Sequence, residues 1–143
     1  MSSYWESSTI ATVLLQQHGW EQLRELAATG PAPCFSDFGA GEVTSAIGIN
    51  VRQGIVDATT GLAAADALGV MLAPWRRELL TQVDIARATS HLRNFTLGLR
   101  LPDALHIAIA ERLNLTLITA DRRQYAAAQV LGIAARNPFD EGA

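Results

Sequence analysis

Residues 101–132, LPDALHIAIAERLNLTLITADRRQYAAAQVLG, read as a helix, a strand and a second helix in immediate succession. The spacing of apolar and turn residues predicts these elements over Asp103–Leu113, Leu115–Thr119 and Arg123–Leu131. Asp103 opens the first helix, and Asp121 lies just past the strand. We therefore expect two carboxylates at the edges of ordered elements rather than on a solvated helix face.

The rest of the chain continues this alternation. Further strands are expected over Ser2–Trp5, Pro33–Ser36 and Ile133–Ala135, and further helices over Ser8–Gln17, Trp20–Ala28, Gly41–Gln53, Thr59–Leu72 and Arg76–Phe95. Asp37 and either Thr59 or Thr60 are candidate helix caps. Strands that alternate with helices indicate an α/β fold with a short parallel sheet flanked by helices. Ligands in such folds bind outside the carboxyl ends of the strands.

Length and composition indicate one domain over residues 1–143. A chain of 143 residues, 49% of them hydrophobic, can bury one substantial core. No apolar run reaches the ~18 residues that span a bilayer, and the first residues, MSSYWESS, lack the basic stretch of a secretory signal. The single cysteine, Cys34, cannot form an intramolecular disulfide. We expect a cytoplasmic protein without a membrane segment.

The charged residues argue against a broad surface for nonspecific binding of nucleic acid. The net charge is −3, whereas such surfaces are strongly basic. All 11 cations are arginine, which makes planar, bidentate contacts to carboxylate or phosphate. Arg100, Arg122 and Arg123 flank the two aspartates, where they could hold phosphates, pair with the acids or be ordinary surface cations.

Four acids stand out by position. Glu6 follows the first strand, Glu42 lies near the start of a helix, and Asp103 and Asp121 border the elements described above. If these carboxylates converge, their repulsion raises some of their pKa values. A bound Mg²⁺ or Mn²⁺ would remove that conflict, because hard cations take oxygen ligands. Such an ion can also activate water and stabilise a phosphate under attack.

Each acid also has a purely structural interpretation. Asp103 could interact favourably with the dipole of its helix, and Glu42 could do the same in its first turn. Asp121 could cap the helix that follows it, a role compatible with metal binding. Glu6 could be a surface acid beside a strand.

Histidine and hydroxyl side chains near these acids are expected to have supporting roles. His106, near the start of its helix, is expected to pack or to make an outer hydrogen bond rather than to bind a metal. Ser7 and Thr119 could bond metal-bound water or a carboxylate, or could satisfy local backbone groups. His18 and His91 lack acidic or cysteine partners at ligand spacing, so we assign them no role.

Three segments resemble the PIN-domain ribonuclease family. LRLPDALHIAIAERLNLTLITADRR (residues 99–123) is similar to the family's C-terminal signature, in which an aspartate opens a helix and a strand ends in T-x-D. The matching acids are Asp103 and Asp121. YWESS (residues 4–8) resembles the opening strand and the acid after it, and SDFGAGEVTSAI (residues 36–47) resembles the region with the family's glutamate. The order of these segments spans nearly the whole chain.

The resemblance implies a PIN-like three-layer fold and a metal-dependent endoribonuclease, similar to the VapC-type toxins of toxin–antitoxin pairs. It implies that Glu6, Glu42, Asp103 and Asp121 hold Mg²⁺ (or Mn²⁺) for hydrolysis of RNA phosphodiester bonds. It further implies a homodimer and a cognate antitoxin protein that covers the acidic site. The chain departs from the family at Glu6, where aspartate is usual. A carboxylate displaced by about 1 Å can cost ~100-fold in rate.

Two alternatives remain at the level of sequence. One is a catalytically weakened PIN-fold protein that binds RNA or a partner without cleavage, with Glu6 as the sign of decay. The other is an acid-rich phosphoryl-transfer or receiver domain. Those domains place a lysine near the site, and this chain contains no lysine.

Overall fold

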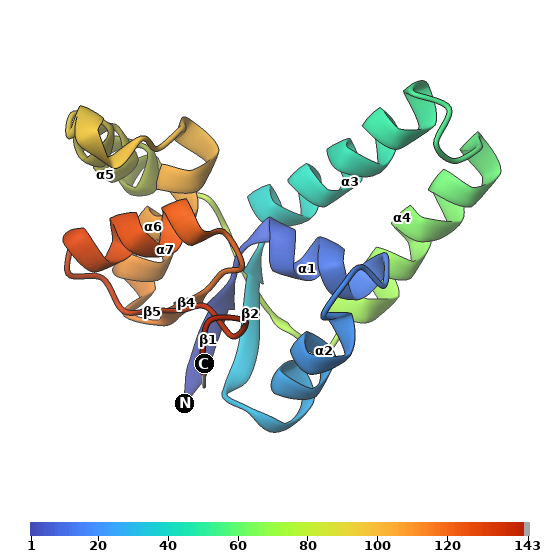
Figure 1. Cartoon of the computed structure of the whole chain (residues 1–143), viewed down its shortest axis with the longest axis horizontal. Helices are drawn as coiled ribbons and strands as arrows, with labels where there is room; N and C mark the ends of the chain where they lie inside the picture. Colours follow the sequence, from blue (N-terminus) through green and yellow to red (C-terminus); the bar gives the residue numbers. More distant parts are fainter. Residues whose placement is uncertain (142–143) are drawn as a thin grey trace.

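Five parallel strands form the sheet in the computed structural model, which describes residues 1–141 (Figure 1). They are β1 (Ser2–Trp5), β2 (Ala32–Ser36), β3 (Arg76–Glu78), β4 (Thr116–Ile118) and β5 (Ala135–Arg136). Their order across the sheet is β3-β2-β1-β4-β5. The last strand begins two residues later than the strand expected over Ile133–Ala135. The expected domain of 1–143 includes Gly142 and Ala143, which lie outside the described residues.

Within the described part of the chain, seven helices and one 3-10 turn connect the strands. They are α1 (Ser7–Leu14), α2 (Trp20–Thr29), α3 (Asp37–Arg52), α4 (Ala58–Leu72), α5 (Gln82–Leu92), the 3-10 turn η1 (Phe95–Leu97), α6 (Leu101–Leu113) and α7 (Arg122–Val130). Within residues 1–141, none of the helices has the length and apolar character needed to cross a bilayer. The α/β fold class expected from the sequence is confirmed.

Alternate residues of the central strands point to opposite faces of the sheet and build two cores. Trp5 and Phe35 lie in one core, together with buried residues of α1, α2, α3 and α4. Tyr4 and Cys34 lie in the other, with buried residues of α6 and α7. Figure 1 accordingly shows α1 to α4 on one side of the sheet and α5 to α7 on the other. This arrangement is the expected three-layer architecture.

The position of β1 in the sheet sets where the candidate acids emerge. β1 pairs with β2 on one side and with β4 on the other, so Tyr4 lies opposite both Cys34 and Leu117. The backbone N–H of Glu6 extends the pairing by donating to the carbonyl of Ile118 at 3.3 Å. Because the strands are parallel, their carboxyl ends share one edge of the sheet. The segments that follow β1, β2 and β4 all start there.

The single helix expected over Arg76–Phe95 is wrong at both ends. Arg76–Glu78 instead forms β3, an edge strand in which Arg76 pairs with Cys34 of β2. The helix in this region, α5, begins only after Thr81, whose side chain caps it by accepting from the backbone N–H of Asp84. Three charged residues carry no apolar alternation that would mark a strand, but charge is common on exposed edge strands.

Two helix caps also differ from expectation. Ser36 rather than Asp37 caps α3, and its hydroxyl accepts from the backbone N–H of Gly39 at 3.0 Å. Asp57 rather than Thr59 or Thr60 caps α4. Both observed caps have the extended backbone that lets a short polar side chain reach back to the first turn.

A buried ion pair joins α5 to α6. Asp84 is fully buried, and its carboxylate accepts hydrogen bonds from Nε of Arg112 at 2.7 Å and from Nη2 at 3.1 Å. The backbone N–H of Thr81 also donates to this carboxylate, at 2.8 Å. Burial on its own raises the pKa of Asp84, but the bonds from Arg112 and Thr81 outweigh it, so the pKa is lowered.

We predict that Asp84→Asn lowers the free energy of unfolding by about 2 kcal/mol at pH 7, because charge-assisted hydrogen bonds are lost. Since the folded pKa of Asp84 is lowered, its contribution is present above the ordinary aspartate pKa of about 3.9. The contribution is lost as the pH falls through the lowered value, so the two proteins should converge in acid. Urea unfolding measures both effects. The exposed control Asp66→Asn should change stability by less than ~0.5 kcal/mol, and equal effects of the two substitutions would contradict the prediction.

Candidate active site

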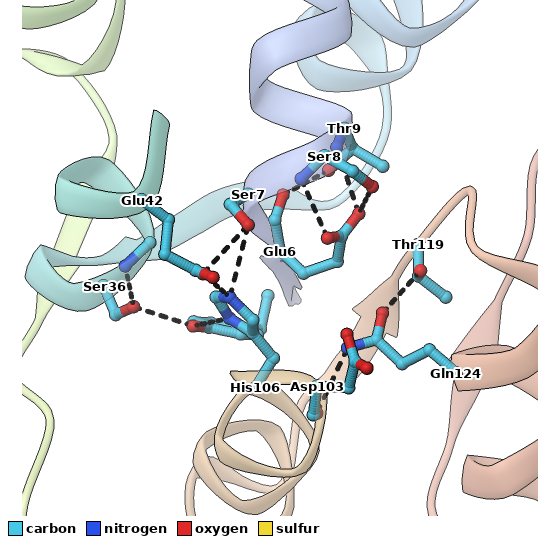
Figure 2. A network of polar contacts seen from close by, with 12 residues as sticks. Glu6, Ser7, Ser8, Thr9, Ser36, Glu42, Asp103, His106, Thr119 and Gln124 are labelled. Carbon is cyan, nitrogen blue, oxygen red and sulfur yellow. Dashed lines mark hydrogen bonds and ion pairs between the residues drawn. The ribbon is translucent and has the colours of Figure 1, made fainter. Parts of the chain in front are cut away.

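Glu6 follows β1 directly and caps α1. Its side chain is only 4% exposed. One carboxylate oxygen accepts from the backbone N–H of Ser8 at 2.8 Å, and the other accepts from the backbone N–H of Thr9 at 3.0 Å and from the Ser8 hydroxyl. Figure 2 shows the carboxylate folded back toward the first turn of α1. Both oxygens of Glu6 are therefore engaged by the helix that it caps.

Burial raises the pKa of Glu6 above its ordinary value. The interaction with His106 and the hydrogen bonds from Ser8 and Thr9 act in the opposite direction but do not cancel the effect of burial. A buried carboxylate of this kind is better stabilised as an ion when a cation lies nearby.

Glu42 extends from α3 to His106 on α6 (Figure 2). Its Oε1 atom accepts from the Ser7 hydroxyl at 2.9 Å and from Nε2 of His106 at 2.5 Å. The side chain of Glu42 is 28% exposed, whereas that of His106 is 2% exposed. Burial raises the pKa of Glu42, but His106 and Ser7 outweigh burial, so the pKa is lowered. Glu42 is thus held as a carboxylate at the edge of the site.

Asp121 and Asp103 stand at the starts of two helices. Asp121 is exposed and caps α7, because its Oδ1 atom accepts from the backbone N–H groups of Arg123 at 2.8 Å and Gln124 at 3.1 Å. Asp103 lies in the first turn of α6, where Oδ2 accepts from the backbone N–H of Arg100 at 3.4 Å. Burial raises the pKa of Asp103, and the negative charge of Asp121 raises it further. The two carboxylates are therefore close enough to repel each other.

Gln124 ties the start of α6, at Asp103, to the end of β4, at Thr119 (Figure 2). This buried side chain donates to the backbone carbonyl of Asp103 at 3.2 Å and accepts from the Thr119 hydroxyl at 2.6 Å. The Thr119 oxygen in turn accepts from the backbone N–H of Asp121 at 3.0 Å. The start of α6, the end of β4 and the start of α7 are thus fixed relative to one another.

A cleft of about 510 Å³ opens between α1 and α3 beside these acids. Its polar lining includes Ser7, Ser8, Thr12, Gln17, Glu42 and Asp121. Acids from two distant parts of the chain therefore face the same space, which is large enough for a small ligand. A second hollow, of about 480 Å³ between α3 and α4, does not have this pairing, because the acid that lines it, Asp37, is paired with Arg77.

Three of the four acids have an oxygen that is suited to a divalent cation. Oε2 of Glu42, Oδ1 of Asp103 and Oδ2 of Asp121 accept no hydrogen bond from the described residues. Carboxylate oxygens are the ligands that Mg²⁺ and Mn²⁺ prefer. A cation would also relieve the repulsion that raises the pKa of Asp103. The chemistry of these donors therefore fits a divalent ion.

The acids are not grouped around a common metal position as the chain stands. Among residues 1–141, no three His, Cys, Asp or Glu side chains form a group able to hold a metal ion. An ion would therefore have to draw Glu42, Asp103 and Asp121 closer together. Glu6 would have to leave its cap to join them. Whether all four acids share one metal site remains a prediction.

Several side chains around the four acids differ from what the sequence predicts. The outer hydrogen bond expected of His106 is confirmed. His91, to which no role was assigned, contacts Glu111 at 3.2 Å between Nε2 and Oε1. Tyr4 and Gln124 were missed, although a tyrosine in an apolar strand signals that a buried hydroxyl needs a partner.

Residues 7–130 match the family model of the PIN domain. The chain belongs to the PIN domain family. The matched range contains Glu42, Asp103 and Asp121 and begins one residue after Glu6, the position at which the sequence departs from the family. A comparison of this PIN domain with curated protein sequences finds no match.

Several solved structures share the fold of this PIN domain. FitAcB from Neisseria gonorrhoeae has a TM-score of 0.75 at 16% identity, over 98% of this chain and 99% of that one. VapBC2 from Rickettsia felis, bound to a promoter DNA fragment, has a TM-score of 0.70 at 11% identity, over 96% and 98%. Mycobacterium tuberculosis VapC20, described as a sarcin–ricin loop cleaving toxin, has a TM-score of 0.67 at 19% identity, over 89% and 95%.

We predict that Asp103→Asn stabilises the protein at pH 7 in EDTA. Because the folded pKa of Asp103 is raised, its favourable contribution is complete below about pH 3.9 and is lost as the pH rises through the folded value. Asparagine does not ionise, so the free energy of unfolding of the variant should be higher than that of the wild type by up to about 1 kcal/mol at pH 7, the scale of a solvent-screened charge interaction. Near pH 3 the two proteins should have nearly the same free energy of unfolding. Urea unfolding at both pH values measures the difference, and a loss of stability at pH 7 would contradict the prediction.

Proposed function

We propose that this PIN domain is a metal-dependent endoribonuclease that hydrolyses RNA phosphodiester bonds. Members of its family are generally nucleases. The observation that carries the proposal is the pairing of Glu42 and Asp121 in one cleft, with Asp103 close enough to feel the charge of Asp121. Acids with opposing pKa shifts beside a cleft are typical of a catalytic site rather than of a solvated surface.

Mg²⁺ or Mn²⁺ would be held by Glu42, Asp103 and Asp121, and by Glu6 once its carboxylate leaves the α1 cap. A cap contributes only about 1 kcal/mol, so an ion can compete for Glu6. When bound, the ion supplies the Lewis acidity that activates water and stabilises charge on the phosphate. The chain's own residues keep the acids in place: His106 and Ser7 bond Glu42, and Gln124 anchors the start of α6.

The substrate would be a flexible, single-stranded part of an RNA. The cleft has the volume of a small ligand, and its polar groups come from α1 and the turn after it, from α3 and from the cap of α7. Arg100 and Arg123 are exposed beside the aspartates and form no ion pair within residues 1–141, so their guanidinium groups are available for phosphate oxygens. The net charge of −3 fits a nuclease that relies on a metal ion rather than on a wide basic surface.

We also propose that the protein is the toxin of a VapBC-type toxin–antitoxin pair. Its structural neighbours include a toxin–antitoxin complex from Klebsiella pneumoniae and the FitAB and VapBC assemblies. In this proposal the protein acts in the cytoplasm as a homodimer, and a cognate antitoxin protein neutralises it by covering the acidic edge of the sheet. Co-expression with the product of the upstream neighbouring gene tests this, since the two proteins should elute together in size-exclusion chromatography.

We predict that the wild type cleaves the single-stranded loops of a structured RNA in Mn²⁺. Asp103→Asn should lower the rate at least ~100-fold, the scale on which misplaced catalytic groups act. Gel analysis of end-labelled RNA measures the rate. The exposed control Asp66→Asn should cleave like the wild type, and EDTA should stop all three proteins. If the wild type cleaves no RNA and no divalent ion shifts its melting temperature, the catalytic proposal is lost.

The cap made by Glu6 favours one second candidate, a weakened PIN domain that binds RNA or a partner without cleavage. Both oxygens of Glu6 are engaged by Ser8 and Thr9, so the acid at the usual aspartate position is not free. This candidate predicts RNA binding in Mn²⁺ that Asp103→Asn leaves unchanged, with no product formed by either protein.

Glu6→Gln separates the two candidates. Glutamine keeps an oxygen that can accept from Ser8 or Thr9, so stability should change by less than about 1 kcal/mol. It removes the negative charge, so Mn²⁺ affinity measured by calorimetry should fall about 10-fold or more if Glu6 joins the metal site. The exposed control Glu25→Gln should bind Mn²⁺ like the wild type. An unchanged affinity in Glu6→Gln would remove Glu6 from the ligand set.

A further inference from the structure

A line of buried hydrogen bonds runs behind Glu42 (Figure 2). The backbone N–H of Gly39 donates to the Ser36 hydroxyl at 3.0 Å, and this hydroxyl lies 2.8 Å from the Tyr4 hydroxyl. The Tyr4 hydroxyl lies 2.8 Å from Nδ1 of His106, and Nε2 of His106 reaches Glu42. The line therefore starts at the cap of α3, crosses β1 and α6, and returns to α3.

The hydrogens along this line have one consistent direction. The Glu42 carboxylate can only accept, so Nε2 of His106 donates to it. If the Ser36 hydroxyl donates to Tyr4 and the Tyr4 hydroxyl donates to Nδ1, each hydroxyl hydrogen has an acceptor. The opposite direction would leave the hydroxyl hydrogen of the fully buried Ser36 without an acceptor among the described hydrogen bonds.

Packing holds the His106 ring in place. His106 is 2% exposed and Tyr4 is fully buried. The ring centroid of Phe38 lies 5.1 Å from that of His106. A Cβ atom at Gly39 would lie 3.2 Å from Cε1 of His106, so the start of α3 closes tightly on the ring. Neither ring has room to rotate away from its hydrogen-bond partners.

Burial keeps the Tyr4 hydroxyl protonated, because it raises the pKa of Tyr4 far above its ordinary value. Tyr4 is therefore a permanent donor to His106 rather than a group that titrates. It also belongs to the core that packs α6 and α7 against the sheet. The ring of Tyr4 thus packs in the core, while its hydroxyl hydrogen-bonds to His106 at the site.

We propose that His106, oriented by Tyr4, is a positioning residue for Glu42. The bond from Nε2 occupies Oε1 of Glu42 and leaves Oε2 for the ion. The inference rests on the proposed function, since it assigns Glu42 to a metal ion. Residues that orient a metal ligand in this way typically affect metal affinity by 10–100-fold.

The test compares two tyrosine variants. Tyr4→Phe removes the donor to His106 and keeps the ring in the core, and Tyr125→Phe removes a hydroxyl from α7 as the matched control. Titration with Mn²⁺, followed by electron paramagnetic resonance, should show an affinity about 10-fold lower for Tyr4→Phe. Tyr125→Phe should bind like the wild type.

Two histidine variants separate positioning from folding. His106→Gln places an amide N–H near the position of Nε2, so it should retain more Mn²⁺ affinity than His106→Ala. If His106 served only in packing, the variants would differ in melting temperature but would bind Mn²⁺ with equal affinity. Equal affinities in folded Tyr4→Phe, His106→Ala and wild-type protein would overturn the proposal.

A metal-free measurement keeps this inference distinct from the proposed function. Long-range ¹H–¹⁵N correlation spectra should show hydrogen on Nε2 of His106 in the wild type and a mixture of ring forms in Tyr4→Phe. Hydrogen on Nδ1 alone in the wild type would overturn the proposal whatever the protein's activity. Loss of Mn²⁺ binding in Asp103→Asn with full binding in Tyr4→Phe would refute positioning and leave the nuclease proposal intact. If the wild type binds no Mn²⁺, the proposed function fails, and positioning of a metal ligand fails with it.

Discussion

The parallel pairing of β1 with both β2 and β4 is the constraint on which the rest of the structure depends. It aligns the carboxyl ends of three strands, so that the segments after them start at one edge. It also buries both faces of β1, with Tyr4 in one core and Trp5 in the other. A shift of one residue would exchange these two side chains and move the hydroxyl of Tyr4 away from His106.

The segments with local signals could be predicted from the sequence, and contacts between distant segments could not. Asp103 and Asp121 lie within one stretch, so their places at element edges follow from apolar spacing and turn residues alone. Glu42 and His106 are 64 residues apart, and their contact exists only because α3 and α6 meet at the same edge of the sheet. Residues Arg76–Glu78 form a strand because they pair with β2, and their own sequence has no apolar alternation that would predict a strand.

Each acid of the candidate site already has a local hydrogen-bonding task. Glu6 and Asp121 cap helices, Glu42 bonds His106, and Asp103 bonds the backbone before its helix. These tasks explain why the acids can be buried or crowded without a cation. The acids nevertheless differ in how readily they ionise, because the pKa is raised at Glu6 and Asp103 and lowered at Glu42. A raised carboxylate pKa next to a cleft is a stability cost typical of functional sites.

The cap made by Glu6 has a consequence for the strength of ion binding. The Glu6 carboxylate can either cap α1 or bind an ion. It binds an ion only in the fraction of molecules in which the cap is broken, so the apparent affinity for the ion is reduced by that fraction. This balance can then be set by residues that do not bind the ion. A change at Ser8 that weakens the cap would tighten ion binding without touching a ligand, and one that strengthens the cap would raise the ion concentration at which the site fills. Substitutions in the first turn of α1 would thus change the ion concentration at which the site fills, without changing the residues that bind the ion.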